Sequence, residues 1–284
     1  EGPCGGLVKL GHYRSGEFGY PKAAINSTLF HTTGDIFGAG SFKNTTVNVG
    51  LLAKWNSAAQ LQWAKKADNR YFHKILETPD GNWVAYSSAD LCVTAKFTPD
   101  GDVLWARSFD VPGSDHPAYI GLDHLAVLPN GDIAVLIHGL NYTAYLFRLD
   151  SDGNLLWQKS FTTITASHIS PASDGSNNLI VTVLGSHYFI LSADGQQIVE
   201  MKEMVFVGDP ALNGLGLTRC NQHPDGSFTL WATHQFIGPP EENALVMLHF
   251  SASGALLWTK SFETPQFVQY YVRYYPGDGW LFNM

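Results

Sequence analysis

Residues 151–161 read SDGNLLWQKSF and hold the pattern that decides the fold. The pattern recurs as SGALLWTKSF ending at Phe262, DGDVLWARSF ending at Phe109 and AAQLQWAKKA ending at Ala67. More degenerate copies are ADGQQIVEMKE, which ends at Glu203, and SGEFGYPKA near the amino terminus. Each copy is typical of a tight turn followed by a short strand with one fixed aromatic position. The chain is therefore built from internal repeats.

Two turns mark each repeat. The residues that align before the tryptophan-type strand are Gly16, Ala59, Gly101, Gly153, Gly195 and Gly254. A second turn lies upstream of each strand, at Thr33-Gly34, Asp80-Gly81, Asn130-Gly131, Asp174-Gly175, Asp225-Gly226 and Asp278-Gly279. Asp-Gly and Asn-Gly favour the positive φ that two-residue hairpins need. Two hairpins, or four strands, in about 45 residues are typical of one propeller blade.

The unit from Asp123 to Phe161 predicts its four strands most clearly. They are expected at His124 to Leu128 (strand A), Ile133 to Ile137 (B), Ala144 to Leu149 (C) and Leu155 to Phe161 (D). Alternation along strand D places Trp157 on the face that packs between neighbouring blades. We interpret the repeated Trp63, Trp105, Trp157 and Trp258 as core residues, with sugar stacking as the alternative.

The two ends of the chain predict one blade between them. The segment Gln266 to Met284 reads as strands A and B, and the segment Gly6 to Ala23 reads as strands C and D. Pairing them closes a ring of six and hides sheet edges. Closure within one chain is favoured by effective concentration, and completion of one chain's blade by another chain is the alternative.

The expected fold is thus an all-β, six-bladed β-propeller in one domain, residues 1–284, with four antiparallel strands per blade and the last blade closed by the N-terminal strands. The predicted blades are residues 24–69, 70–111, 117–163, 164–206, 212–263, and 266–284 together with 5–23.

The repeat resembles that of the bacterial-type β-propeller repeat proteins, whose units read roughly DG-strand-G-loop-KLD-x-DG-x-LLW-x-K-x-F. The match is clearest in Gly131 to Phe161 and Gly226 to Phe262, and weaker in Gly34 to Ala67 and Gly81 to Phe109. The resemblance implies a propeller and no single chemistry, because propellers host lectins, scaffolds, hydrolases and lyases. The fourth unit departs most, since Val199 replaces the tryptophan and two extra residues follow Gly175.

Composition narrows the partners. With 284 residues, 45% of them apolar, the chain can bury a substantial core, and no window is apolar for long enough to suggest a membrane span. The formal charge of −8 argues against nucleic acid. A first residue other than Met and the sequons at Asn26, Asn44 and Asn141 favour a secreted, extracellular glycoprotein.

The three cysteines match no zinc spacing. Cys4, Cys92 and Cys220 allow at most one internal bridge, which leaves one thiol either buried or paired with another chain.

Linear catalytic motifs are missing, but propeller sites are assembled from several blades. The sequence contains no G-x-S-x-G elbow, no H-E-x-x-H, no P-loop and no G-x-G-x-x-G that opens a helix. We therefore compared equivalent positions at the start of each strand A, which ring one mouth of a propeller channel. They are Ser27, Lys74, His124, His168, Arg219 and Val272, preceded by Asn26, His73, Asp123, Ser167, Thr218 and Tyr271.

This ring predicts two kinds of site. Basic groups at a concave mouth favour a carboxylate, phosphate or sulfate, with expected ligand-binding residues Lys74, Asp123, His124, His168, Arg219, Tyr271, His138 and His234. Alternatively His73, His124 and His168, from consecutive units, could hold zinc with an open fourth position. Hydrogen bonding of these histidines to backbone is the third interpretation.

The two faces of the expected propeller differ. The three sequons are predicted on the histidine-rich face, in loops that enter strand A or join strands B and C. The opposite face carries turn carboxylates that turn chemistry explains, with weak calcium binding as the alternative: Asp80, Asp100, Asp152, Asp174, Asp194 and Asp225.

These patterns predict a secreted propeller that acts as a binding or assembly module for a glycan, a small anionic ligand or a neighbouring protein. One alternative is a hydrolase or lyase at the histidine-rich mouth, with zinc or calcium. The other is a subunit of an extracellular polymer joined through cysteine or through the split blade.

Overall fold

The protein is described by a computed structural model, and the description covers the ranges that follow: 23–31, 33–43, 48–68, 70–88, 92–111, 124–139, 143–162, 166–172, 175–183, 187–203, 216–223, 225, 227–235, 243–251, 256–264, 271–275 and 279–283. Strands fill most of these residues, and none of them lies in a helix. In this part of the chain, therefore, no helix is long and apolar enough to cross a membrane.

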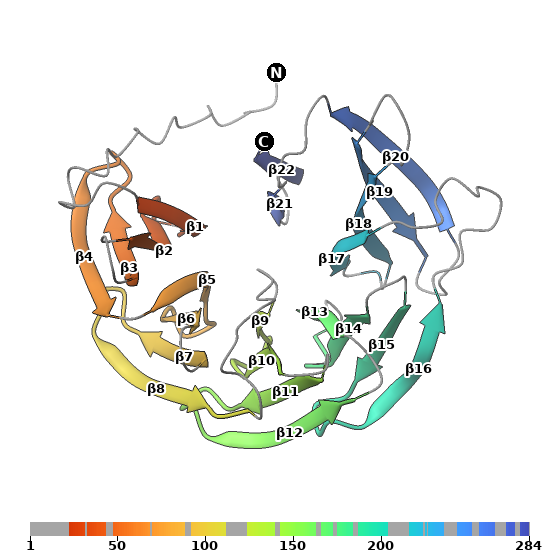
Figure 1. The fold of residues 1–284 in the computed structure, drawn as a ribbon, viewed down its shortest axis with the longest axis horizontal. Helices are drawn as coiled ribbons and strands as arrows, with labels where there is room; N and C mark the ends of the chain where they lie inside the picture. Colours follow the sequence, from red (N-terminus) through yellow and green to blue (C-terminus); the bar gives the residue numbers. More distant parts are fainter. Residues whose placement is uncertain are drawn as a thin grey trace. The chain divides into compact units, whose positions relative to one another are not determined.

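Five four-stranded antiparallel sheets follow one another along the chain (Figure 1). The first contains β1 (Ala23–Phe30), β2 (Ile36–Lys43), β3 (Asn48–Trp55) and β4 (Leu61–Asp68), and the second contains β5 (Tyr71–Glu77), β6 (Trp83–Ser88), β7 (Cys92–Phe97) and β8 (Val103–Phe109). The third contains β9 (Leu125–Val127), β10 (Ile133–His138), β11 (Ala144–Leu149) and β12 (Leu155–Phe161).

The later sheets have the same order. The fourth contains β13 (Ala166–Pro171), β14 (Leu179–Val183), β15 (His187–Leu191) and β16 (Gln197–Glu203), and the fifth contains β17 (Gly216–Gln222), β18 (Phe228–Gln235), β19 (Asn243–Phe250) and β20 (Leu256–Thr264). A two-stranded sheet of β21 (Tyr271–Tyr275) and β22 (Gly279–Asn283) ends the chain. In each four-stranded sheet every strand pairs with the next one, as a double hairpin requires.

The chain divides into two compact units. Residues 1–125 and 137–140 form the first, which holds the first two sheets, and residues 126–136 and 141–284 form the second. The third sheet belongs mostly to the second unit, together with the fourth and fifth sheets.

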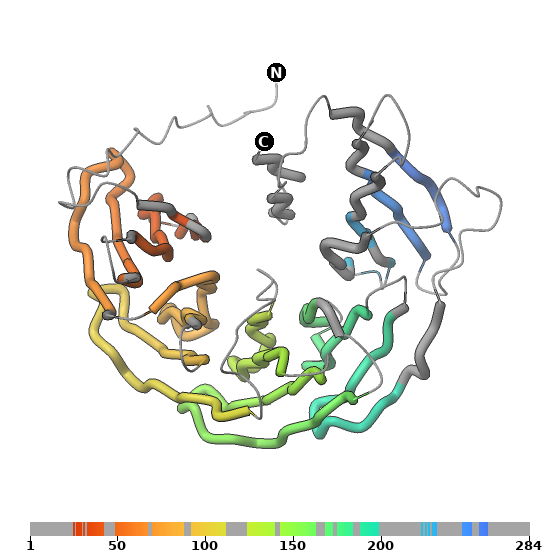
Figure 2. The backbone as a smooth tube through the Cα atoms, viewed as in Figure 1, coloured from red at the N-terminus to blue at the C-terminus, as the bar shows by residue number. Residues whose placement is uncertain are grey.

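The strands of the template repeat are confirmed in type and order. Strands B, C and D lie where they were expected, as β10 to β12, and strand A is shorter, as β9. Figure 2 shows the backbone passing through the four strands in sequence order. Both predicted turns form, because Gly131 N–H donates to Leu128 O at 2.9 Å and Gly153 N–H donates to Asp150 O at 3.0 Å. Both glycines have positive φ, as hairpin turns of this kind demand.

The core lies between successive sheets inside each unit. In the second unit, apolar side chains of the third sheet, such as Leu136 and Leu146, pack with Val181 and Phe189 of the fourth. In the first unit, Phe37 and Leu52 pack with residues of the second sheet. The second strands are the most completely buried, whereas the fourth strands alternate between exposed and half-buried residues.

The tryptophan of strand D contacts the next sheet, as predicted for Trp157. Its Nε1–H donates to Ala193 O at 2.9 Å, and a Cβ on Gly195 would meet its ring at 3.1 Å. Trp63 lies in the same way under Gly101, at 3.0 Å. These side chains are half-buried, because strand D is the outermost strand of its sheet.

The core prediction is wrong for Trp258, which is 38% exposed. Its ring stacks on His249 at 4.9 Å, and Lys260 Nζ lies 5.4 Å from its centroid. A side chain on an outer strand is covered only by what the neighbouring element supplies. Here the contacts come from within the fifth sheet itself.

Closure of a sixth blade is a prediction that the structure does not test. The carboxyl-terminal segment forms two antiparallel strands as expected, with Tyr274 opposite Trp280. Residues 1–22, which would supply the other two strands, lie outside the described residues.

Candidate ligand-binding site

A β-bulge recurs at one position of the innermost strand. The register of the first hairpin shifts between Ile25 and Ser27 in the first sheet, between Phe72 and Lys74 in the second, between Ala166 and His168 in the fourth, and between Leu217 and Arg219 in the fifth. The extra residues are Asn26, His73, Ser167 and Thr218, members of the ring that the sequence predicts. Bulges re-aim side chains and are common beside binding sites.

We call this edge of each sheet the bulged end. It is the end where strand A begins and strand B finishes, and the A–B and C–D turns lie at the opposite turn end. Tyr71 opposite Ser88, at the start of β5 and the end of β6, shows that these positions come together in one sheet. The predicted grouping of strand A starts with strand B ends is therefore confirmed within individual sheets.

The bulged end of the second sheet is aromatic. The ring of His73 lies 6.4 Å from that of Tyr71, nearly parallel, and 6.1 Å from that of Tyr86. Burial lowers the pKa of the His73 imidazole to about 4, so the ring is neutral at physiological pH. His73 can thus stack or hydrogen-bond, but it adds no positive charge to the site.

Cys92 lies behind this cluster as a buried free thiol. The hydroxyl of Tyr86 donates a hydrogen bond to Cys92 Sγ at 3.2 Å. Burial raises the pKa of both groups. A buried protonated thiol is a poor partner for another chain, so Cys92 is the buried member that the odd cysteine count allowed.

The residue after the bulge is a lysine in the second sheet and a serine in the first. Lys74 is half-buried and stands opposite Tyr86. The equivalent residue of the first sheet, Ser27, is buried, and its Oγ accepts a hydrogen bond from Ile75 N–H at 3.3 Å. This contact ties the bulged ends of the first and second sheets together within one unit.

His124 and His138 approach each other, with ring centroids 4.8 Å apart in an edge-to-face arrangement. His124 is only 2% exposed, whereas His138 is half-buried. His138 is thus the more accessible of the two predicted ligand contacts.

The other candidate residues are placed by backbone alone or not at all. His168 lies opposite Thr182 in the fourth sheet and is half-buried. The backbones of three further candidates have partners in register: Arg219 with Trp231, His234 with Ala244, and Tyr271 with Asn283. Asp123, Asn44 and Asn141 lie outside the described residues.

The predicted position of Asn26 is wrong. It was expected in a loop that enters strand A, but it lies inside β1, at the bulge. The strand begins earlier than the apolar pattern indicated, because the bulge residue interrupts the alternation on which that expectation rested. Glycosylation at Asn26, as at the other two sequons, stays a prediction.

The metal hypothesis also stays a prediction. Among the residues that the structure describes, no three His, Cys, Asp or Glu side chains gather as a metal site would require. His73 and His124 belong to the first unit and His168 to the second.

At the turn end, the carboxylates form a network that the sequence reasoning missed. Three of them pair with a cation on strand C: Asp35 with Lys54 at 3.0 Å, Asp80 with Lys96 at 2.7 Å, and Asp132 with Arg148 at 2.7 Å. A constant offset could have revealed these cations, because each stands five residues before the C–D turn residue Ala59, Gly101 or Gly153. Each also lies opposite the tryptophan of strand D.

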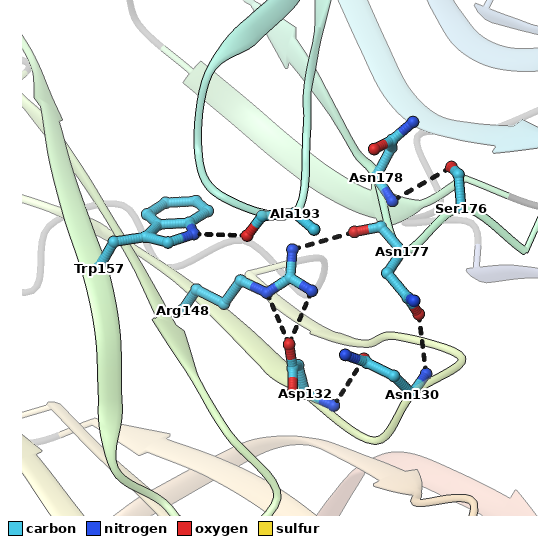
Figure 3. Close-up of polar contacts among 8 residues, drawn as sticks. All are labelled: Asn130, Asp132, Arg148, Trp157, Ser176, Asn177, Asn178 and Ala193. Carbon is cyan, nitrogen blue, oxygen red and sulfur yellow. Dashed lines mark hydrogen bonds and ion pairs between the residues drawn. The ribbon is translucent and has the colours of Figure 1, made fainter.

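The pair in the third sheet is the most enclosed (Figure 3). Arg148 is 1% exposed, and its Nε and Nη2 both donate to Asp132 Oδ2, at 2.9 and 2.7 Å. Its Nη1 donates to Asn177 O at 2.9 Å, and Asn177 Oδ1 accepts from Asn130 N–H at 2.8 Å. The two extra residues of the fourth repeat thus form a turn that bonds to the preceding sheet.

Hydrogen bonds at the turn end lower the pKa of three carboxyls. Burial opposes ionisation of Asp80, but hydrogen bonds from Lys96, Thr78 and Asn82 hold the pKa of its carboxyl well below the usual value. Hydrogen bonds from Ser192 and Ser227 likewise lower the pKa of Asp194 and Asp225. Turn hydrogen bonds therefore account for Asp194 and Asp225, whereas Asp80 is also held by Lys96 of strand C.

Comparison with known proteins bears on the fold. No family model matches the chain, and no curated protein matches it. Among solved structures, the chain is similar to a Bacteroides caccae protein of unknown function, with a TM-score of 0.58 and 12% identity over 84% of this chain and 82% of that one.

Two further similar structures are propeller domains by description. The WD40 domain of Neurospora crassa Pan2 gives a TM-score of 0.53 at 9% identity, over 84% of this chain and 66% of that one. The β-propeller domain of Myceliophteria thermophila Cps50 (Swd1) gives 0.51 at 8% identity, over 84% and 88%. Together with the succession of four-stranded antiparallel sheets, these likenesses assign the chain a β-propeller fold.

Proposed function

We propose that this chain is a binding module that holds a small anionic ligand, such as an acidic sugar, at the bulged end of its second sheet. The observation that carries the proposal is the bulge, which recurs at one position in four sheets. It places a polar or basic pair at each bulged end, within a chain of net charge −8.

Two properties of the described residues support an acidic sugar over a bare ion. Lys74 supplies positive charge directly after the bulge of the second sheet. Near Lys74, the half-buried Tyr71 supplies an aromatic ring for a sugar, and the neutral His73 packs against that ring. Charge and ring faces at one edge suit a ligand that carries both a carboxylate or sulfate and an apolar face.

The test is binding of the full chain to an array of acidic and neutral glycans, followed by calorimetry with the strongest ligand. Lys74→Met should weaken binding about 10-fold or more, because a hydrogen bond to a charged group contributes about 1.5–3 kcal/mol. Lys65→Met is the matched control, since Lys65 lies on outer strand β4 and pairs with Asp102. The proposal fails if no acidic glycan binds, or if both variants weaken binding equally.

We further propose that residues 5–22 close a sixth blade with β21 and β22, since Ala23 already belongs to β1. The two-stranded sheet of β21 and β22 supports this, because it supplies half of the four antiparallel strands that each of the other sheets contains. Deleting residues 1–22 should lower the unfolding temperature by several degrees and promote association, and an unchanged monomer would contradict closure.

Secretion is part of the same proposal and rests on the sequons. Expression in a eukaryotic secretory system should give a protein whose mass falls on enzymatic deglycosylation. The Asn44→Gln and Asn141→Gln variants should each remove one step of that loss. Unglycosylated protein from such cells would contradict the proposal.

A further inference from the structure

The A–B turns of the second and fifth sheets have similar sequences and the same closing hydrogen bond. The A–B turns read Thr-Pro-Asp-Gly-Asn from Thr78 and His-Pro-Asp-Gly-Ser from His223. Each is closed by the same hydrogen bond, from Thr78 N–H to Asn82 O at 2.9 Å and from His223 N–H to Ser227 O at 2.7 Å. Side chains in the two sheets can therefore be compared position by position.

Three positions change together between these sheets. Thr78 becomes His223, Lys96 becomes His249, and the residue opposite that cation changes from Val84 to Thr229. In the second sheet, Lys96 Nζ lies 2.7 Å from Asp80 Oδ2, and Thr78 Oγ1 donates to Asp80 Oδ1 at 2.5 Å. In the fifth sheet, therefore, two imidazole rings stand where the second sheet has Lys96 and Thr78, and the hydroxyl of Thr229 lies between the rings.

The two rings share that hydroxyl. His223 Nε2 lies 2.6 Å from Thr229 Oγ1, and His249 Nδ1 lies 3.0 Å from the same oxygen. Thr229 is 1% exposed, and the ring centroids are 5.3 Å apart. A hydroxyl has one proton, so with neutral rings it donates to one imidazole and accepts from the other.

Protonation of both rings breaks this arrangement. Each ring nitrogen then carries a proton toward the same oxygen, and the hydroxyl proton loses its acceptor. Two positive charges also meet at short range beside a buried group. The charged groups around the rings are Asp225, whose carboxylate is bonded to Ser227 N–H at 2.9 Å and to Ser227 Oγ at 2.6 Å, and Lys260, which lies over Trp258.

We propose that His223, Thr229 and His249 form an acid-sensitive switch that loosens the turn end of the fifth sheet when both imidazoles are protonated. Trp258 reports on it, because its ring stacks on His249 at 4.9 Å with planes 20° apart.

The sign of the pH effect follows from His223. Burial, and then the proximity of His249, lower the pKa of His223 from 6.5, while Asp225 opposes them. A histidine whose pKa is depressed by folding contributes stability that is present above its unfolded pKa and is lost as the pH falls. Asp225, whose pKa is lowered from 3.8, titrates below this window.

The test compares the full-length protein with the triple variant H223T/T229V/H249K, which carries the residues of the second sheet. Two quantities are measured between about pH 7.5 and pH 5: the urea unfolding midpoint, and the emission of Trp258, isolated by subtracting the spectrum of Trp258→Phe. In the unmodified chain both should change with a transition below pH 6.5. The triple variant should lose the emission transition and most of the fall in the midpoint.

Two further variants keep the test decisive. H31Q removes a histidine at the same turn position of the first sheet, where His31 pairs with Glu77 at 3.1 Å, and should leave the Trp258 transition unchanged. Should the triple variant fail to fold, Thr229→Val alone removes the shared hydroxyl and should shift the transition. Emission that does not change with pH, or that changes equally in the unmodified chain and the folded variant, overturns the proposal.

Discussion

The third sheet has an ion pair at its turn end, whereas the fourth sheet has apolar residues at the corresponding positions of strands C and D. The third sheet has a carboxylate in the A–B turn, a cation on strand C and a tryptophan on strand D: Asp132, Arg148 and Trp157. At the corresponding positions of strands C and D, the fourth sheet has Ile190 and Val199, which lie opposite each other. Both sheets nevertheless form the same four strands in the same order.

The difference shows that formation of the four-stranded sheet does not depend on the ion pair. The second strands β10 and β14 are fully or almost fully buried in both sheets, and their apolar side chains share one cluster. A buried ion pair is weak evidence of net stabilisation, because desolvation offsets the attraction between its charges. What the third sheet gains is attachment, because Arg148 and the Asn130 N–H both donate hydrogen bonds to Asn177 in the turn of the fourth sheet (Figure 3).

The largest expected effect comes from breaking the pair on one side. Arg148→Met should destabilise the protein by about 3–5 kcal/mol, because it leaves the Asp132 carboxylate, which is 8% exposed, without its cation. The double variant Asp132→Asn/Arg148→Met removes both charges of the pair, so that the third sheet, like the fourth, has no ion pair at these positions. It should lose clearly less, as measured by urea unfolding.

Equal losses in the single and double variants would contradict this account. They would mean that the stability lies in the contacts of the arginine side chain, and not in the pairing of the buried charge. The double-mutant comparison separates these cases.

A smaller effect should separate the two turns of the fourth sheet. Gly195 and Gly175 both have positive φ, of 84° and 73°. A Cβ at Gly195 would meet the Trp157 ring at 3.1 Å, whereas a Cβ at Gly175 would meet nothing within 4 Å. Gly195→Ala should therefore cost about 2–3 kcal/mol, and Gly175→Ala about 1–2 kcal/mol from the backbone alone.

The measurement is the unfolding midpoint, with the emission of Trp157 as a local probe. Gly195→Ala should perturb the environment of Trp157, and Gly175→Ala should not. Indistinguishable variants would show that the tryptophan does not depend on the close approach of this turn.

The smallest effect is expected from Asn177, whose side chain links the fourth sheet to the third. Asn177→Gly removes the acceptor for Asn130 N–H, while it keeps the positive φ of 58° and the carbonyl that Arg148 contacts. The expected loss is about 1 kcal/mol. Asn177→Ala should cost about 1 kcal/mol more, because alanine is strained at this φ. A loss in both variants that equals that of Arg148→Met would mean that the link, and not the ion pair, dominates.

The sequence predicted the strands well where the repeat is explicit. The alternation in Leu155–Phe161 and the turns at Gly131 and Gly153 depend on local geometry, so one copy is enough to identify them. The contact of Trp157 with the next sheet was also predicted, because strand D has only one apolar face to bury. The exposure of Trp258 was not, because it depends on what another element places beside it.

The sequence predicted which residues lie at the candidate site, but not the bulges or the side chains that surround them. Alignment of the repeats identified Asn26, His73, Ser167 and Thr218, but an interrupted alternation looks the same at a bulge and at the end of a strand, so the bulge was not predicted. The neutral state of His73 depends on burial among rings from two strands. From the sequence, His223 and His249 are interpreted as surface or core residues, because their contact with Thr229 depends on the pairing of β18 with β19.

The recurring bulge has a consequence for engineering. The extra residue stands outside the regular register of its hairpin, so a substitution there leaves the backbone pairing of the sheet in place. Residues 26, 73, 167 and 218 are therefore positions at which recognition residues can be varied in one repeat at a time, with the packing of each side chain, such as that of His73 against Tyr71 and Tyr86, as the remaining constraint.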